Sequence, residues 1–81
     1  MTNDEAFATF KDAAVEVLSV DPSAVVPEAS FADDLDADSL DLVEFVMALE
    51  DKFGVEIPES DLDGVKTVGQ AFDIVVAKLG I

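Results

Sequence analysis

Apolar residues recur at three- and four-residue spacing along three stretches of this chain, and that spacing restricts the chain to an all-α fold. The first stretch predicts a helix over residues 4–20, whose start is favoured by a capping box of Thr2 and Glu5. The helix should end before Pro22, since a residue that precedes proline avoids helical backbone angles. Its apolar face consists of Phe7, Phe10, Ala14, Val17 and Leu18. No stretch shows the alternation expected of a β-strand.

The second stretch predicts a helix over residues 39–53, with Asp38 as its N-cap and Gly54 as its end. The helical repeat places one set of apolar residues on a face that should pack in the core: Leu42, Phe45, Val46, Leu49 and Phe53. A separate apolar strip lies to one side of this face and consists of Leu40, Val43 and Met47. Acidic residues flank the strip, so this helix carries more apolar surface than core packing needs.

Two further helices are predicted in the C-terminal part. A short one covers residues 59–63 and ends at Gly64, and a longer one covers residues 68–79. Thr67 and Gln70 form a capping box at the start of the longer one. Three longer helices and one short helix predict a small four-helix bundle. Because the chain has 81 residues, a single domain that spans all of it is expected.

A long connection, residues 21–37, joins the first two longer helices. Pro22 and Pro27 prevent it from forming one continuous helix. Its large apolar residues are too many for a free linker: Val25, Val26, Phe31 and Leu35. We therefore expect the connection to fold back and close one end of the core.

The composition excludes several classes of function. The formal net charge is −15, which repels nucleic acids and anionic membranes and attracts basic protein surfaces. Cysteine and histidine are absent, so the chain has no disulfide, no Cys/His metal site and no general base that titrates near neutral pH. With no catalytic triad or glycine-rich phosphate loop either, the chain is predicted not to be an enzyme. No signal peptide or membrane-spanning stretch is recognised, so the cytoplasm is the expected compartment. The chain is also expected to be a monomer.

Ser39 lies where an acidic loop turns into the second predicted helix. Asp36, Asp38 and Asp41 surround it in the sequence, and nothing nearby could activate its hydroxyl for catalysis. A hydroxyl presented in this way is typical of an attachment point, and the unpaired N–H groups of a helix start tolerate an attached anion. Serine and aspartate are also common at helix starts, so an Asp-Ser-Leu triplet alone favours a purely structural role.

The wider sequence favours attachment. Residues 31–58, FADDLDADSLDLVEFVMALEDKFGVEIP, resemble the acyl carrier proteins, and the resemblance extends over nearly the whole chain. It implies that Ser39 carries a 4′-phosphopantetheine arm derived from coenzyme A. Asp38 and Leu40 complete the attachment motif, and Asp38 would help to present the serine. By the same resemblance, partner enzymes dock on Asp41, Val43, Glu44, Met47, Glu50 and Asp51.

Within that family the chain is most similar to a discrete carrier of type II fatty acid biosynthesis, which holds growing acyl chains as thioesters. The implied partners are a phosphopantetheinyl transferase and acyl transferases, ketosynthases, reductases and dehydratases with basic docking patches. A polyketide carrier is the alternative within the family. Asp36 stands where the family commonly has glycine, which should reduce the backbone freedom of that turn. In the family the acyl chain can withdraw between the helices. The candidates to line such a space are better explained as ordinary core, because apolar residues at helical spacing need no further role: Phe45, Val46, Leu49, Phe72 and Val75.

Two other classes stay open. A calcium-binding loop would use Asp34, Asp36 and Asp38 as its first ligands, but Ser39 and Phe45 occupy positions that need glycine and glutamate. No specific metal site is therefore expected, although crowded carboxylates should bind divalent cations weakly. An acidic adaptor that is never modified would tolerate Ser39→Ala, whereas a carrier would lose its function.

Overall fold

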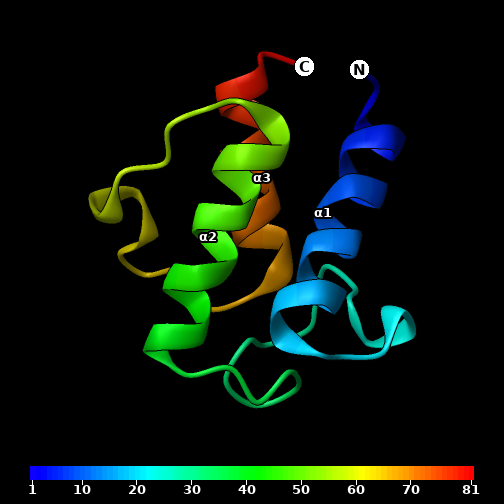
Figure 1. Cartoon of the computed structure of the whole chain (residues 1–81), viewed down its shortest axis with the longest axis vertical. Helices are drawn as coiled ribbons and strands as arrows, with labels where there is room; N and C mark the ends of the chain where they lie inside the picture. The colour runs from blue at the N-terminus through cyan, green and yellow to red at the C-terminus, as the bar shows by residue number, and fades with distance from the viewer.

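Three α-helices and two 3₁₀ turns make up the regular structure of the described chain. The computed structural model describes residues 1–81 apart from the side chain of Glu59. In chain order the elements are α1 (Asn3–Leu18), η1 (Pro22–Ala24), α2 (Ser39–Phe53), η2 (Glu59–Leu62) and α3 (Val68–Leu79). α1 and α2 run in opposite directions, and the two termini lie at the end opposite to the long connection (Figure 1). Among the described residues, no helix combines the length and apolar character that crossing a membrane requires.

The predicted starts of the three longer helices are confirmed by their capping bonds, to within one residue at α1. The Thr2 hydroxyl accepts a hydrogen bond from the Glu5 N–H at 3.2 Å, and the Thr67 hydroxyl accepts one from the Gln70 N–H at 3.3 Å. Asp38 caps α2 in the same way. The three helices each end at a residue with left-handed backbone angles: Ser19, Gly54 and Gly80. Since each cap depends on residues no more than four positions apart, the local sequence determines these boundaries.

The predicted four-helix bundle is confirmed only in part. The segment that the sequence pattern assigns to a short fourth helix forms the 3₁₀ turn η2 instead. An ion pair of 3.0 Å between Asp61 and Lys78 connects this turn to the last turn of α3. α1 ends at Leu18, two residues earlier than predicted, because Ser19 leaves the helix with a φ of 56°. The fold is therefore all-α, with three helices and short turns between them.

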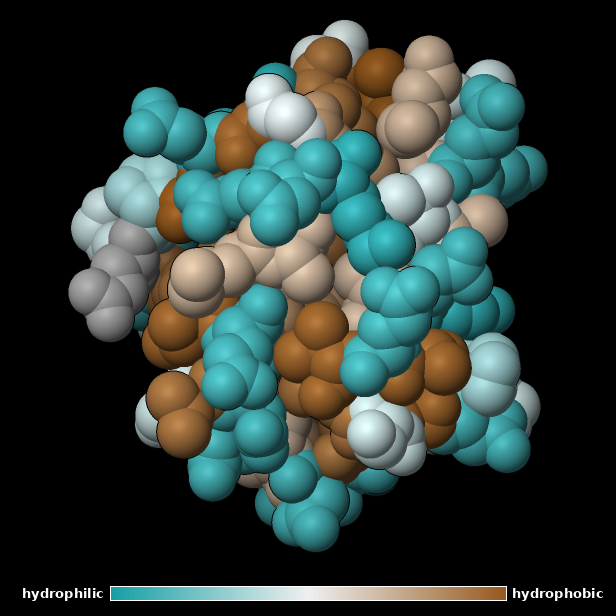
Figure 2. Space-filling view, in the orientation of Figure 1, coloured by the Kyte–Doolittle hydropathy of each residue, from teal (hydrophilic) through white to brown (hydrophobic). Residues whose placement is uncertain are grey.

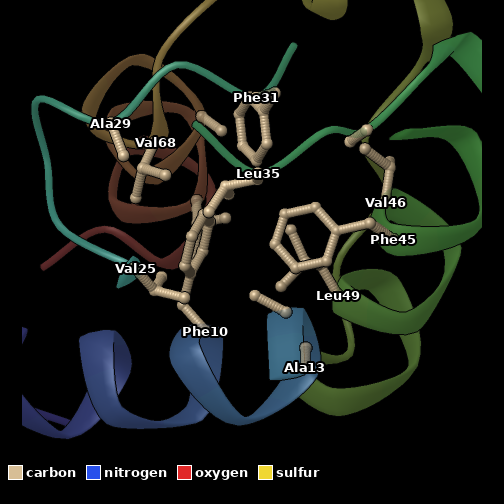
Figure 3. Close-up of a cluster of buried hydrophobic side chains, with 14 of the residues drawn as sticks. Phe10, Ala13, Val25, Ala29, Phe31, Leu35, Phe45, Val46, Leu49 and Val68 are labelled. Atoms are coloured by element: carbon tan, nitrogen blue, oxygen red, sulfur yellow. The ribbon is translucent and has the colours of Figure 1, made fainter. Parts of the chain in front are cut away.

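Aromatic side chains hold the core together (Figure 3). Phe10 of α1 and Phe45 of α2 meet edge to face, with ring centroids 5.0 Å apart and ring planes at 88°. Phe31 of the long connection packs against Phe45 with a centroid distance of 5.8 Å. On the predicted core face of α2, the buried residues are Phe45, Val46 and Leu49, and the half-buried ones are Leu42 and Phe53. Phe45 thus joins α1, α2 and the connection in one cluster.

The long connection folds back over the core, as predicted. It begins with η1, which the sequence pattern does not predict and which forms because the Asp21 carboxylate accepts a hydrogen bond from the Ser23 N–H at 2.9 Å. Its buried large side chains are Val25, Phe31 and Leu35. The Phe31 N–H donates to the Lys66 carbonyl at 3.0 Å, and the Phe31 carbonyl accepts from the Ala37 N–H at 2.8 Å. These two bonds fix the segment before α3 and the segment before α2 to the same residue.

Candidate functional site

Ser39 is the first residue of α2, and its side chain is exposed. The Asp38 carboxylate accepts a hydrogen bond from the Asp41 N–H at 2.9 Å, and the Asp41 carboxylate accepts one from the Asp38 N–H at 3.3 Å. This reciprocal capping box fixes the backbone on both sides of Ser39. The hydroxyl therefore has a defined position at the positive end of the helix dipole and is accessible from outside.

The groups around Ser39 suit attachment better than catalysis. The carboxylates of Asp38 and Asp41 already accept backbone hydrogen bonds, and the chain contains no histidine or cysteine that could act as a base or nucleophile. An alcohol without an activating base does not react by itself at neutral pH. The Ser39 hydroxyl therefore depends on another protein for any covalent chemistry.

An open groove of about 360 Å³ adjoins Ser39. Its walls come from the 30–33 segment of the connection, the start of α2 and the Val65–Lys66 pair before α3. The apolar side chains on the walls include Phe31, Ala37, Leu42 and Val65, and the charged ones are Asp33, Asp38 and Lys66. A group attached to the Ser39 hydroxyl would meet both apolar and polar side chains in this groove. Val65 and Lys66 could not be found from the sequence, since they approach Ser39 only in the folded chain.

The apolar strip predicted on α2 is exposed. Leu40, Val43 and Met47 leave 66%, 38% and 59% of their surface accessible. On the face where α2 lies, Figure 2 shows hydrophobic surface interrupted by hydrophilic side chains. Exposed apolar residues rimmed by charge are typical of an interaction surface, and methionine adapts to partners of different shape.

The acidic residues predicted to dock partners are not equivalent in the structure. Glu44 and Asp51 are exposed, whereas Asp41 and Glu50 are partly buried. The Glu50 carboxylate accepts a hydrogen bond from the Ile57 N–H at 2.9 Å and so holds the segment after α2 against the helix. Asp41 and Glu50 therefore serve the fold as well, while the charges of Glu44 and Asp51 face solvent.

A second hollow, of about 240 Å³, lies beside the apolar strip. Its lining residues are Val43, Val46, Met47, Glu50, Ile57 and Leu62. Of the residues considered for an acyl chamber, Val46 lines this hollow, whereas Phe45, Leu49 and Val75 are buried within the core. The sequence pattern does not place Ile57 and Leu62 at this hollow, because they come from the segment that follows α2 and not from a helix with a recognisable apolar face.

The carboxylates considered for a calcium loop have other roles. Asp34 accepts a hydrogen bond from the Ser30 N–H at 2.6 Å, and Asp38 caps α2. Across the part of the chain that the structure describes, no group of three carboxylates is arranged to hold a metal ion.

Asp36 has left-handed backbone angles, with a φ of 53°. Replacing it by glycine is expected to raise the free energy of unfolding by about 0.5–1 kcal/mol, because glycine adopts this φ without a Cβ clash. Urea denaturation measures the change. Asp33→Gly is the matched control, since it removes the same charge from the same connection at a residue without positive φ, and it should lower stability. An Asp36→Gly chain no more stable than the Asp33→Gly chain would contradict this account of the turn.

Comparison with known proteins gives one consistent result. Residues 8–74 match the family model described as a phosphopantetheine attachment site. An acyl carrier protein of Thermosynechococcus vestitus is 51% identical over 98% of this chain and 98% of its own length. One from Petrotoga mobilis is 49% identical over 100% of this chain and 95% of its own. One from Lactobacillus acidophilus is 41% identical over 99% of this chain and 100% of its own.

Proposed function

Because this chain belongs to the acyl carrier proteins, which bear a covalent 4′-phosphopantetheine and are carriers rather than enzymes, we propose that Ser39 is its attachment site and that it serves type II fatty acid biosynthesis. The observation that carries the proposal is the exposed Ser39 hydroxyl, held at the start of α2 beside an open groove. Asp38 fixes the backbone there, and Leu40 is the exposed apolar residue next to it. The arm supplies the thiol that the polypeptide lacks, and acyl chains are carried on it as thioesters.

The first partner of the chain is a phosphopantetheinyl transferase, which takes the arm from coenzyme A. The later partners are the acyl transferases, ketosynthases, reductases and dehydratases of the pathway. We assign their docking surface to the apolar strip together with the exposed Glu44 and Asp51, and to Asp41 and Glu50 at its edge. A basic patch on a partner is attracted to these charges, which speeds encounter, and salt weakens the attraction. The working form is a single cytoplasmic domain that acts as a monomer.

Glu44→Lys is expected to lower kcat/KM of a partner enzyme for the loaded carrier about tenfold at low salt. The reversal replaces an attraction by a repulsion within the docking surface and leaves the core untouched. Asp12→Lys on α1 is the matched control, because it makes the same change of charge at an exposed residue on another helix. Equal turnover of both variants would place the docking surface elsewhere, and circular dichroism verifies that both are folded.

The pathway is tested by reconstitution. The arm-bearing protein is supplied to purified type II fatty acid synthase enzymes with acetyl- and malonyl-coenzyme A and with NADPH and NADH as reductants, and the acyl groups attached to it are identified by mass spectrometry. Fully reduced chains that lengthen by two carbons per cycle are the expected products. A chain that accepts malonyl groups but is elongated only by polyketide synthase enzymes would contradict the fatty acid assignment and favour the polyketide carrier.

A further inference from the structure

Lys66 lies on the wall of the same groove as Ser39. It is exposed and lies immediately before Thr67, the N-cap of α3. The other three lysines have partners elsewhere in the fold: Lys11 lies over the Phe7 ring, Lys52 pairs with Glu16, and Lys78 pairs with Asp61.

The backbone of Lys66 is held firmly in this position. Its carbonyl accepts the hydrogen bond from the Phe31 N–H at 3.0 Å, and the Phe31 carbonyl accepts from Ala37, two residues before Ser39. On the other side, the Lys66 N–H donates to the Gln70 side-chain carbonyl at 2.7 Å. The attachment residue and the lysine are therefore positioned by the same short chain of hydrogen bonds, and only the flexible lysine side chain has to adjust.

Negative charges surround Ser39, and a nearby lysine can offset them. Asp33 and Asp38 line the groove, and Asp36 lies in the turn that leads to it. A phosphodiester on Ser39 adds one more negative charge to a chain that already carries a formal charge of −15. Repulsion at such short range acts against holding the phosphate close to the protein, and a cation on the opposite wall offsets it.

We propose that the Lys66 ammonium group is the counter-ion of the arm's phosphodiester and keeps the phosphate end of the arm in this groove. The inference rests on the proposed attachment at Ser39. With the phosphate so placed, the carbon skeleton next to it contacts the apolar walls formed by Leu42 and Val65. An arm held in this way starts from a defined direction when a partner enzyme withdraws it.

Thermal unfolding of chains with and without the arm tests the proposal. For each protein, the quantity compared is the melting temperature of the arm-bearing form minus that of the unmodified form. At low salt this difference is expected to be about 1–5 °C lower in Lys66→Gln than in the wild type. High salt should abolish that difference, since the pair is exposed. Lys11→Gln, which removes the same charge on α1, is the control and should behave as the wild type does.

The phosphorus-31 resonance of the arm gives a second, direct readout. In the wild type it should differ from the resonance of the same chain unfolded in urea, and Lys66→Gln should move it toward the unfolded value. Suppose that intact mass shows the arm in place, but the phosphorus-31 resonance and the melting difference are the same in wild type and Lys66→Gln. That result would overturn the role of Lys66 and leave the proposed function standing. A folded chain that acquires no arm would overturn the proposed function along with it.

Discussion

Replacing Phe45 by alanine is expected to remove most of the stability of this protein. The Phe45 side chain is fully buried and packs against Phe10 from α1 and Phe31 from the long connection. Truncation of a buried phenylalanine lowers the free energy of unfolding by about 3–5 kcal/mol, because apolar contacts are lost and a cavity is left behind. A domain has about 5–15 kcal/mol in total, and a chain of 81 residues lies toward the low end of that range, so the variant should be partly unfolded near 37 °C.

Phe53→Ala is the matched control for this variant. Phe53 lies on the same helix but is only half-buried, so its truncation should cost about 1–2 kcal/mol. Urea denaturation followed by circular dichroism gives both free energies. Equal losses in the two variants would show that the aromatic cluster does not organise the core as described.

Ser39→Ala is expected to abolish carrier function completely while leaving the fold unchanged. The hydroxyl is the only group of this residue that can be esterified, and alanine is a good residue for the first turn of a helix. The side chain is exposed, so the free energy of unfolding should change by no more than about 0.5 kcal/mol. Urea denaturation and the formation of acyl-carrier product by partner enzymes measure the two effects.

Ser60→Ala removes another exposed serine hydroxyl, on η2, and should behave as the wild type in both measurements. Carrier activity that survives Ser39→Ala would disprove attachment at this residue. A loss of activity accompanied by unfolding would instead point to a structural role for Ser39, the role that its place at a helix start also suggests.

The features that the sequence predicts correctly are those that depend on near neighbours. The start of α2 follows from Asp38, and its end follows from Gly54, which takes a φ of 67°. The exposed strip of Leu40, Val43 and Met47 follows from the helical repeat alone. The conformation of these residues is determined by their neighbours in the sequence, so the prediction matches the structure there.

The features that the sequence does not predict depend on contacts between distant segments. Lys66 lies at the groove of Ser39 because backbone hydrogen bonds join its segment to the long connection, among them the bond with Phe31, 35 positions earlier in the printed sequence. Lys52 pairs with Glu16 across α1 and α2, which no local pattern indicates. The short turn η2 is a further example, because a segment of four residues is too short for helical periodicity to distinguish an α-helix from a 3₁₀ turn.

Asp36 lies between these two cases. The acyl carrier proteins commonly have glycine at this position, so aspartate here predicts a turn with restricted backbone freedom. In the structure the residue has a positive φ. The sequence indicates where the backbone is unusual, and the structure supplies the conformation that makes it so.

The most direct test of this account is the mass of the unmodified chain after incubation with coenzyme A, Mg²⁺ and a broad-range phosphopantetheinyl transferase, followed by fragmentation of the proteolytic peptide that contains Ser39. We expect a single phosphopantetheine increment, located on Ser39 and missing from Ser39→Ala. A folded, unmodified chain that gains no increment, or gains it on another residue, would contradict the account.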